Sequence, residues 1–180
     1  MFTALHDVDV AAFLLIQQLP HPTWVIGLMW VFSLAGTAGC VWVVTAIIIA
    51  IRNHDFGGFW RVLLAITFVI GIVDVGLKPL IDRDRPYEHN QTVASSMSAT
   101  PSTSSFPSGH AATSAAGAYA VARLASAATA FVWPMALAIT FSRIYLGMHY
   151  PLDVIAGWLI GLAASVFVTG GVSYGKRMTR

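Results

Sequence analysis

The 180-residue chain has few charged side chains and a single cysteine. Only 10% of its residues are charged, whereas a soluble domain usually carries about 25%. This shortage of charge, together with 57% hydrophobic residues, excludes a disordered chain and disfavours an ordinary soluble globule. The net charge of +2 is too small to indicate a nucleic-acid partner. Cys40 has no second cysteine, which excludes an intrachain disulfide and a cysteine zinc site, and its apolar neighbours predict a buried thiol.

Long apolar runs take the place of the missing charge, and the mean hydropathy is +0.72. A helix needs about 20 apolar residues to cross a membrane. The runs predict an all-α fold, an integral membrane helical bundle with five transmembrane helices, as a single domain over residues 1–180. The five predicted spans are 23–51, 62–81, 108–122, 126–141 and 151–169.

Two shorter patterns add detail to this bundle. The apolar segment 8–19 has 12 residues and is followed by two prolines, which predicts a short N-terminal interfacial helix, with a sixth span as the alternative. Small residues recur every fourth position in the third span, and Gly157 and Gly161 form a GxxxG pattern in the fifth. Both patterns predict close packing between helices, within the same chain in preference to the alternative of a dimer contact.

The distribution of lysine and arginine predicts the orientation. Five spans divide these residues six to four between the two sides, and the richer side is expected in the cytoplasm. The N-terminus, the 82–106 loop and the turn before the fifth span then face away from the cytoplasm. The predicted cytoplasmic residues are Arg52, Arg61, Arg123, Lys176, Arg177 and Arg180, against Lys78, Arg83, Arg85 and Arg143 on the other side.

Polar residues are costly in an apolar chain, and they gather in the segments 78–86, 107–110 and 142–153. The predicted topology brings all three segments to one membrane face. Arginine presents a planar fork that matches phosphate oxygens. Ser108 is predicted to cap the third span, whose N–H groups form an anion site. Together these features indicate a phosphate pocket, with the candidate ligands Lys78, Arg85, Ser108, Gly109 and Arg143.

Two histidines at the same face predict the chemistry. His149 lies just before Pro151, which suits the first position of a helix, and Asp153 follows four residues after His149. A carboxylate there can hold one imidazole nitrogen and leave the other as a nucleophile. His110, in the first turn of another helix, can protonate a leaving oxygen. No carboxylate cluster indicates magnesium, so the sequence predicts neither a metal nor a cofactor.

These motifs resemble the type 2 phosphatidic acid phosphatase superfamily, which includes bacterial membrane lipid phosphatases and vanadium haloperoxidases. The family pattern is Lys-x6-Arg-Pro, then Pro-Ser-Gly-His, then Ser-Arg-x5-His-x3-Asp, and this chain fills every fixed position. The resemblance implies a metal-independent phosphatase in which His149 forms a phosphohistidine, Asp153 orients it and His110 is the general acid. It also implies that the phosphate ligands are the five residues proposed above.

Three residues are assigned supporting roles. Asp74 lies one turn before Lys78 and is predicted to pair with it, the alternative being a partner on another helix. Arg83 flanks the first motif, with a further phosphate contact as one alternative, and Ser142 belongs to the third motif without a defined role. The 82–106 loop is either a lid over the site or a solvated connection.

The resemblance implies a lipid phosphate or diphosphate substrate within membrane lipids. A polyprenyl diphosphate such as undecaprenyl diphosphate is the first choice, followed by phosphatidylglycerol phosphate and phosphatidic acid. The expected location is a bacterial cytoplasmic membrane, with the site on the extracytoplasmic side. Two alternatives remain: a phosphotransferase with a lipid or sugar acceptor, and a non-catalytic protein that binds lipid phosphates. The His149–Asp153 pair disfavours the second, because binding alone needs only the cations.

Overall fold

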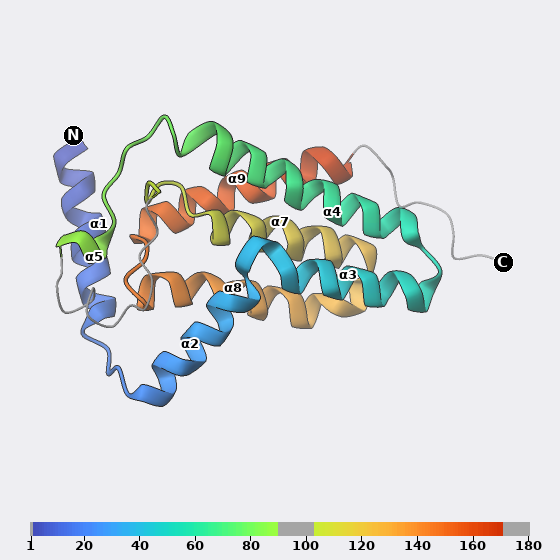
Figure 1. Ribbon diagram of the computed structural model, residues 1–180, viewed down its shortest axis with the longest axis horizontal. Helices are drawn as coiled ribbons and strands as arrows, with labels where there is room; N and C mark the ends of the chain where they lie inside the picture. The colour runs from blue at the N-terminus through green and yellow to red at the C-terminus, as the bar shows by residue number, and fades with distance from the viewer. Residues whose placement is uncertain (1, 90–102, 171–180) are drawn as a thin grey trace.

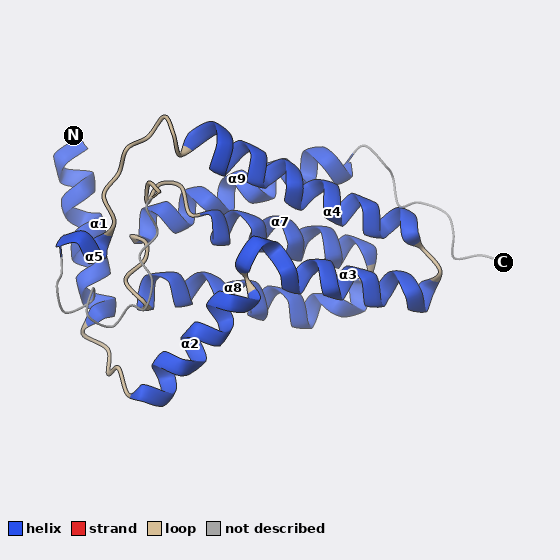
Figure 2. Ribbon diagram, in the orientation of Figure 1, coloured by secondary structure: helices blue, strands red, loops and turns tan. Residues whose placement is uncertain are grey.

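A computed structural model of the chain describes residues 2–89 and 103–170. Within these residues every regular element is helical, which confirms the predicted all-α fold (Figures 1 and 2). A 3-10 turn, Thr37–Gly39, lies between α2 and α3, and the π-helical segment Gly71–Leu77 continues α4. The α-helices are α1 (Phe2–Gln17), α2 (Thr23–Ala35), α3 (Cys40–Asn53), α4 (Phe56–Ile70), α5 (Pro86–His89), α7 (Gly109–Leu124), α8 (Thr129–Tyr145) and α9 (Pro151–Gly170).

Helix α7 lies in the middle of the bundle, packed against α4, α8 and α9 (Figure 1). Small residues let α7 and α9 approach each other closely, and two of them are glycines of α9. A Cβ atom added to Gly157 would clash with the carbonyl oxygen of Ser108, and one added to Gly161 would clash with that of Ala112. The predicted role of the GxxxG pattern in packing helices of the same chain is therefore confirmed.

The predicted number of five spans is not confirmed. Among the described residues, three helical stretches are long and apolar enough to cross a membrane: Phe56–Leu77, Ser126–Tyr145 and Pro151–Gly170. The predicted span 23–51 is broken, because α2 and α3 meet at an angle of 52° and together make at most a fourth span. Positive φ angles at Ala38 and Gly39 produce this bend. Helix α7 has 16 residues, and its neighbours shield it, so it does not need a long apolar surface.

Cys40 begins α3 directly after the bend, and its side chain is exposed. The predicted buried thiol is therefore wrong. Several large apolar residues of α3, among them Val44 and Ile48, are also exposed on the surface of the bundle. In a membrane protein, apolar neighbours in the sequence do not distinguish the core from the surface that faces lipid.

Helix α1 lies across the end of the bundle, at a steep angle to the other helices (Figure 1). Phe13 is buried on its inner side, against the ring of Tyr150. Leu5, Val8 and Leu15 are exposed on its outer side. A short helix with one buried side and an exposed apolar side fits the predicted interfacial helix.

The antiparallel packing brings the three polar segments to one end of the bundle. There the π-helical continuation of α4 ends, α7 begins, α8 ends and α9 begins, at the left of Figure 1. Arg52 and Arg123 lie in the last turns of α3 and α7, at the opposite end. The predicted convergence of the motifs at one end is confirmed.

Candidate active site

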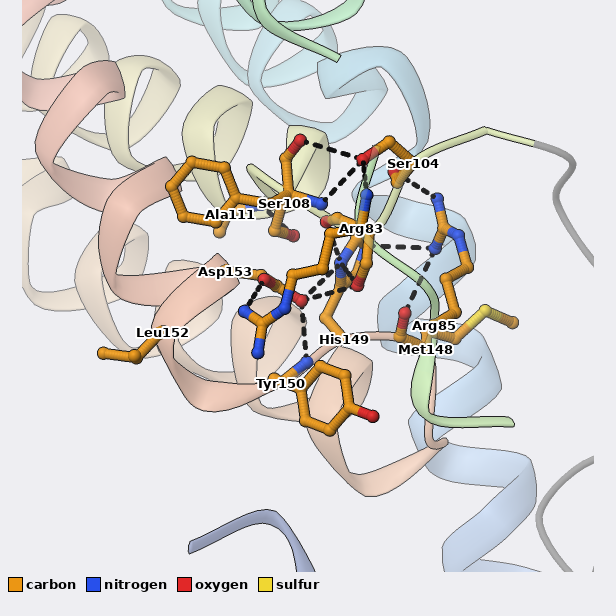
Figure 3. Close-up of polar contacts among 12 residues, drawn as sticks. Arg83, Arg85, Ser104, Ser108, Ala111, Met148, His149, Tyr150, Leu152 and Asp153 are labelled. Atoms are coloured by element: carbon orange, nitrogen blue, oxygen red, sulfur yellow. Dashed lines mark hydrogen bonds and ion pairs between the residues drawn. The ribbon is translucent and has the colours of Figure 1, made fainter. Parts of the chain in front are cut away.

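The imidazole of His149 lies in the short loop between α8 and α9 and is 2% exposed. Its Nδ1 lies 2.8 Å from the carbonyl oxygen of Ser105. Because a carbonyl oxygen only accepts hydrogen bonds, Nδ1 carries the proton and donates it to Ser105. The other ring nitrogen, Nε2, is then free to act as a nucleophile and lies 3.4 Å from Nη1 of Arg85 (Figure 3).

Asp153 is fully buried beside this histidine. Its Oδ2 accepts hydrogen bonds from the Ser105 hydroxyl at 2.5 Å and from the backbone N–H of Tyr150 at 2.9 Å. The second bond is a capping-box contact, in which an acid in the first turn satisfies the N–H of the residue before the helix. Nδ1 of His149 lies 3.6 Å from Oδ2, so Asp153 reaches the histidine mainly through Ser105 rather than by a direct hydrogen bond.

Arg83 faces Asp153 from the opposite side, and both of its terminal nitrogens are engaged. Nη1 lies 2.5 Å from Oδ1 of Asp153, and Nη2 lies 2.5 Å from Oδ2 of Asp9 on α1. The guanidinium also lies over the ring of Tyr150, 4.4 Å from its centroid. These contacts hold Arg83 in a supporting position next to Asp153, and the further phosphate contact stays a prediction.

The other two arginines of the site, Arg85 and Arg143, are buried without a carboxylate partner among the described residues. Arg85 donates to the backbone carbonyls of Thr103, Ser104 and Met148 at 2.8–3.2 Å. Arg143 is 5% exposed; its Nη1 donates to the hydroxyl of Ser33, and its Nε has no partner in the described part of the chain. A buried cation without a counter-charge is costly. The two guanidinium groups therefore favour an anion in this site.

Lys78 pairs with Asp74 at 2.6 Å, the i,i+4 pair expected from the sequence. Both residues line a cavity of about 220 Å³ together with Gly109 and His110. A Cβ atom on Gly109 would lie 3.4 Å from Nζ of Lys78, so glycine keeps space open beside the ammonium group. Nε2 of His110 is buried and has no hydrogen-bond partner among the described residues, which leaves it available to a ligand.

The two motif serines serve the helix ends. The hydroxyl of Ser108 caps α7 by accepting from the N–H of Ala111 at 3.4 Å, as predicted. The N–H of Ser108 donates to the backbone carbonyl of Asp153, which ties the start of α7 to the start of α9. Ser142 is buried, and its hydroxyl donates to the carbonyl of Ile139 within α8 at 2.6 Å. Its contact is with its own helix.

Burial determines the protonation state of the central histidine. Removal from water is the largest of the effects that lower the pKa of His149 to about 4; the nearby cations Arg143 and Arg85 act in the same direction, and Asp153 opposes them. At neutral pH the imidazole is therefore uncharged, as a nucleophile requires. The pKa of Arg83 is raised, because its two carboxylates outweigh the opposing effect of burial.

Sequence reasoning missed three residues of this site. Ser105 lies in a stretch rich in serine and threonine, where nothing distinguishes it from its neighbours. Ser33 is a polar residue within a long apolar run. Asp9 carried a usable signal, since an acid inside an apolar helix usually has a partner. Part of the 82–106 loop, residues 90–102, lies outside the described residues, as do Lys176, Arg177 and Arg180.

Comparison with known proteins shows which proteins the chain is similar to. The chain is 33% identical over 153 residues to an undecaprenyl-diphosphatase of Sulfolobus acidocaldarius, covering 78% of this chain and 70% of that protein. It is 34% identical over 141 residues to a decaprenylphosphoryl-5-phosphoribose phosphatase of Mycobacterium tuberculosis, covering 77% and 75%. The crystal structure of a transmembrane PAP2-type phosphatidylglycerolphosphate phosphatase from Bacillus subtilis has the same fold, with a TM-score of 0.75, 23% identity and coverage of 98% and 90%.

The family assignment rests on a match that includes all three motifs. A sequence model described as the PAP2 superfamily matches residues 58–177, which is two thirds of the chain. The matched region begins in α4 and contains the histidines, Asp153 and the buried arginines. This protein is a member of the PAP2 superfamily.

Proposed function

We propose that this protein is a membrane lipid phosphatase that works through a phosphohistidine. The observation that carries the proposal is the environment of His149. Its unprotonated Nε2 lies 3.4 Å from Arg85, and the neighbouring buried Arg143 has no carboxylate partner among the described residues. A phosphate group would fill this position, because it supplies the missing negative charge and presents its phosphorus to Nε2.

The reaction has two displacements. Nε2 of His149 attacks phosphorus and forms an N–P bond, while the bond between phosphorus and the leaving oxygen breaks. His110 gives its proton to that oxygen. A water molecule then attacks the phosphohistidine, the N–P bond breaks, and His110 takes a proton from the water. Arg85, Arg143 and Lys78 stabilise the negative charge of the transferring phosphoryl group in both steps.

A polyprenyl phosphate or diphosphate is the proposed substrate. The site lies at the end of the bundle, beside the interfacial helix α1, which suits a headgroup whose tail stays in the bilayer. The Sulfolobus and Mycobacterium relatives are both named for polyprenyl phosphates, and this supports a polyprenyl chain over a diacylglycerol. Undecaprenyl diphosphate is therefore the first substrate to test, followed by phosphatidylglycerol phosphate and phosphatidic acid.

Phosphate release by the purified protein tests this function. We expect the protein to hydrolyse at least one lipid of that panel, and we expect EDTA to leave the rate unchanged, because side-chain cations neutralise the phosphate charge. Loss of activity with EDTA, restored by magnesium or zinc, would contradict the proposed site. Transfer of phosphate to an added lipid or sugar in place of water would identify a phosphotransferase instead.

The site is proposed to face the extracytoplasmic side of the membrane. The basic residues Arg52, Arg61 and Arg123 lie toward the end of the bundle opposite the motifs, and such residues favour the cytoplasm. Asp82, near the site, and Asn53, at the far end of α3, are both exposed. In a Cys40→Ala background, Asp82→Cys should react with a membrane-impermeant maleimide in intact cells, whereas Asn53→Cys should not. The reverse pattern would put the site in the cytoplasm.

A further inference from the structure

We propose that Asp9, on the N-terminal helix, is a positioning residue that acts through Arg83 on the catalytic Asp153. The inference depends on the phosphatase function proposed above. One arginine joins the two acids: its Nη2 lies 2.5 Å from Asp9, and its Nη1 lies 2.5 Å from Asp153. Asp9 is 1% exposed and Asp153 is fully buried. Through this chain of contacts, α1 reaches the centre of the active site.

Asp9 also contacts the helix that carries the catalytic acid. Its Oδ1 accepts a hydrogen bond from the backbone N–H of Leu152 at 2.9 Å, in the first turn of α9. A negative charge at this position is favourable, because the N-terminus of a helix is electropositive. One end of the Asp9 carboxylate therefore holds Arg83, and the other end holds the backbone next to Asp153.

The rest of α1 fixes this carboxylate in place. Gln17, at the end of the helix, donates to the carbonyl of Ile144 at 2.9 Å. Phe13 packs edge-on against the ring of Tyr150, the residue that donates its N–H to Asp153. Exposed leucine and valine side chains cover the opposite side of α1. The helix thus turns its one buried acid toward the site and its apolar side away from it.

The balance of charge explains why Arg83 needs a second acid. With Asp153 alone, Arg83 would form a neutral pair and cancel the negative charge that the histidine needs nearby. Asp9 adds a second negative charge, so the three side chains together carry a net charge of −1. This charge stabilises the imidazole of His149 when it becomes positive during attack on phosphorus. Arg83 can then orient Asp153 without neutralising it.

Substitution of Asp9 by asparagine tests this role, because asparagine keeps the shape and removes the charge. We expect Asp9→Asn to lower kcat between about tenfold and a hundredfold. KM should stay near its normal value, because Asp9 does not line the phosphate pocket. The matched control is Asp7→Asn, which removes an exposed acid from the same helix and should leave kcat unchanged. Asp9→Glu, which retains the charge, should recover part of the lost kcat.

A double-mutant cycle separates positioning from simple stabilisation. Since Asp9 acts through Arg83, adding Asp9→Asn to Arg83→Met should cause no further loss of kcat. Rates are compared per mole of folded protein. The thermal unfolding curve of each variant gives the fraction that is folded at the assay temperature. Additive losses, a change confined to KM, or a normal kcat per folded Asp9→Asn molecule would each overturn the inference.

If the unaltered protein hydrolyses no lipid phosphate, the proposed function fails and this inference fails with it. If the unaltered protein and Asp9→Asn are equally active, only this inference fails.

Discussion

Replacement of His149 by alanine is expected to lower kcat by about four orders of magnitude or more. The substitution removes the Nε2 atom that attacks phosphorus, and no other imidazole among the described residues lies beside Arg85. Transient phosphorylation gives a second readout. With a lipid substrate labelled in its phosphate, rapid quenching at alkaline pH should trap an acid-labile phosphoenzyme in the unaltered protein and none in His149→Ala.

A matched histidine variant shows whether the effect is specific. His54 is exposed at the turn between α3 and α4 and has a positive φ of 53°, a conformation that asparagine tolerates. His54→Asn therefore removes an imidazole from the opposite end of the bundle without straining the turn, and its kcat should be unchanged. Substantial hydrolysis by folded His149→Ala, or a phosphoenzyme in that variant, would rule out His149 as the nucleophile.

Replacement of His110 by alanine should slow hydrolysis of a lipid phosphate by about a hundredfold to ten-thousandfold. An alkoxide leaving group needs a proton as it departs. His110 lines the same cavity as Lys78, and its buried Nε2 has no hydrogen-bond partner in the part of the chain that the structure describes. An aryl phosphate does not need this proton, because a phenolate leaves unaided. With nitrophenyl phosphate, His110→Ala should therefore release a rapid burst of one nitrophenol per site. Slow turnover should follow, because water must then attack the phosphohistidine without a general base.

The comparison of the two substrates decides the role of His110. A burst with the aryl phosphate and none with the lipid places His110 at the leaving oxygen. Equal losses with both substrates and no burst would contradict a general acid and indicate that His110 serves only to bind phosphate. His54→Asn again provides the control, with normal kinetics expected on both substrates.

The helical class and the convergence of the motifs were predictable because both depend on properties that are local in the sequence. Apolar runs indicate membrane helices, and alternation of their direction brings the ends of successive helices together. The capping role of Ser108 and the pairing of Asp74 with Lys78 were predictable for the same reason, since each involves residues within one turn of a helix.

The break between α2 and α3 and the exposure of Cys40 were not predictable. No proline marks the bend, and the segment from Gly36 to Cys40 contains only small residues that are compatible with a continuous span. Next to the bend the backbone packs closely against α7 and α8, since a side chain on Gly36 would collide with Ile139 of α8 and crowd His110 of α7. Such a preference arises from neighbours that are far away in the sequence.

By itself, the sequence determined the candidate nucleophile, the cations and the end of the bundle at which they meet, because each belongs to a short motif with fixed spacing. Only the tertiary structure revealed how Asp153 is held. It receives the hydroxyl of Ser105, which is 48 positions away, and the guanidinium of Arg83, whose other acid, Asp9, lies on the N-terminal helix. These partners come from separate segments of the chain. Folding selects them because a buried carboxylate must have its charge and hydrogen bonds satisfied by whichever groups packing brings within reach.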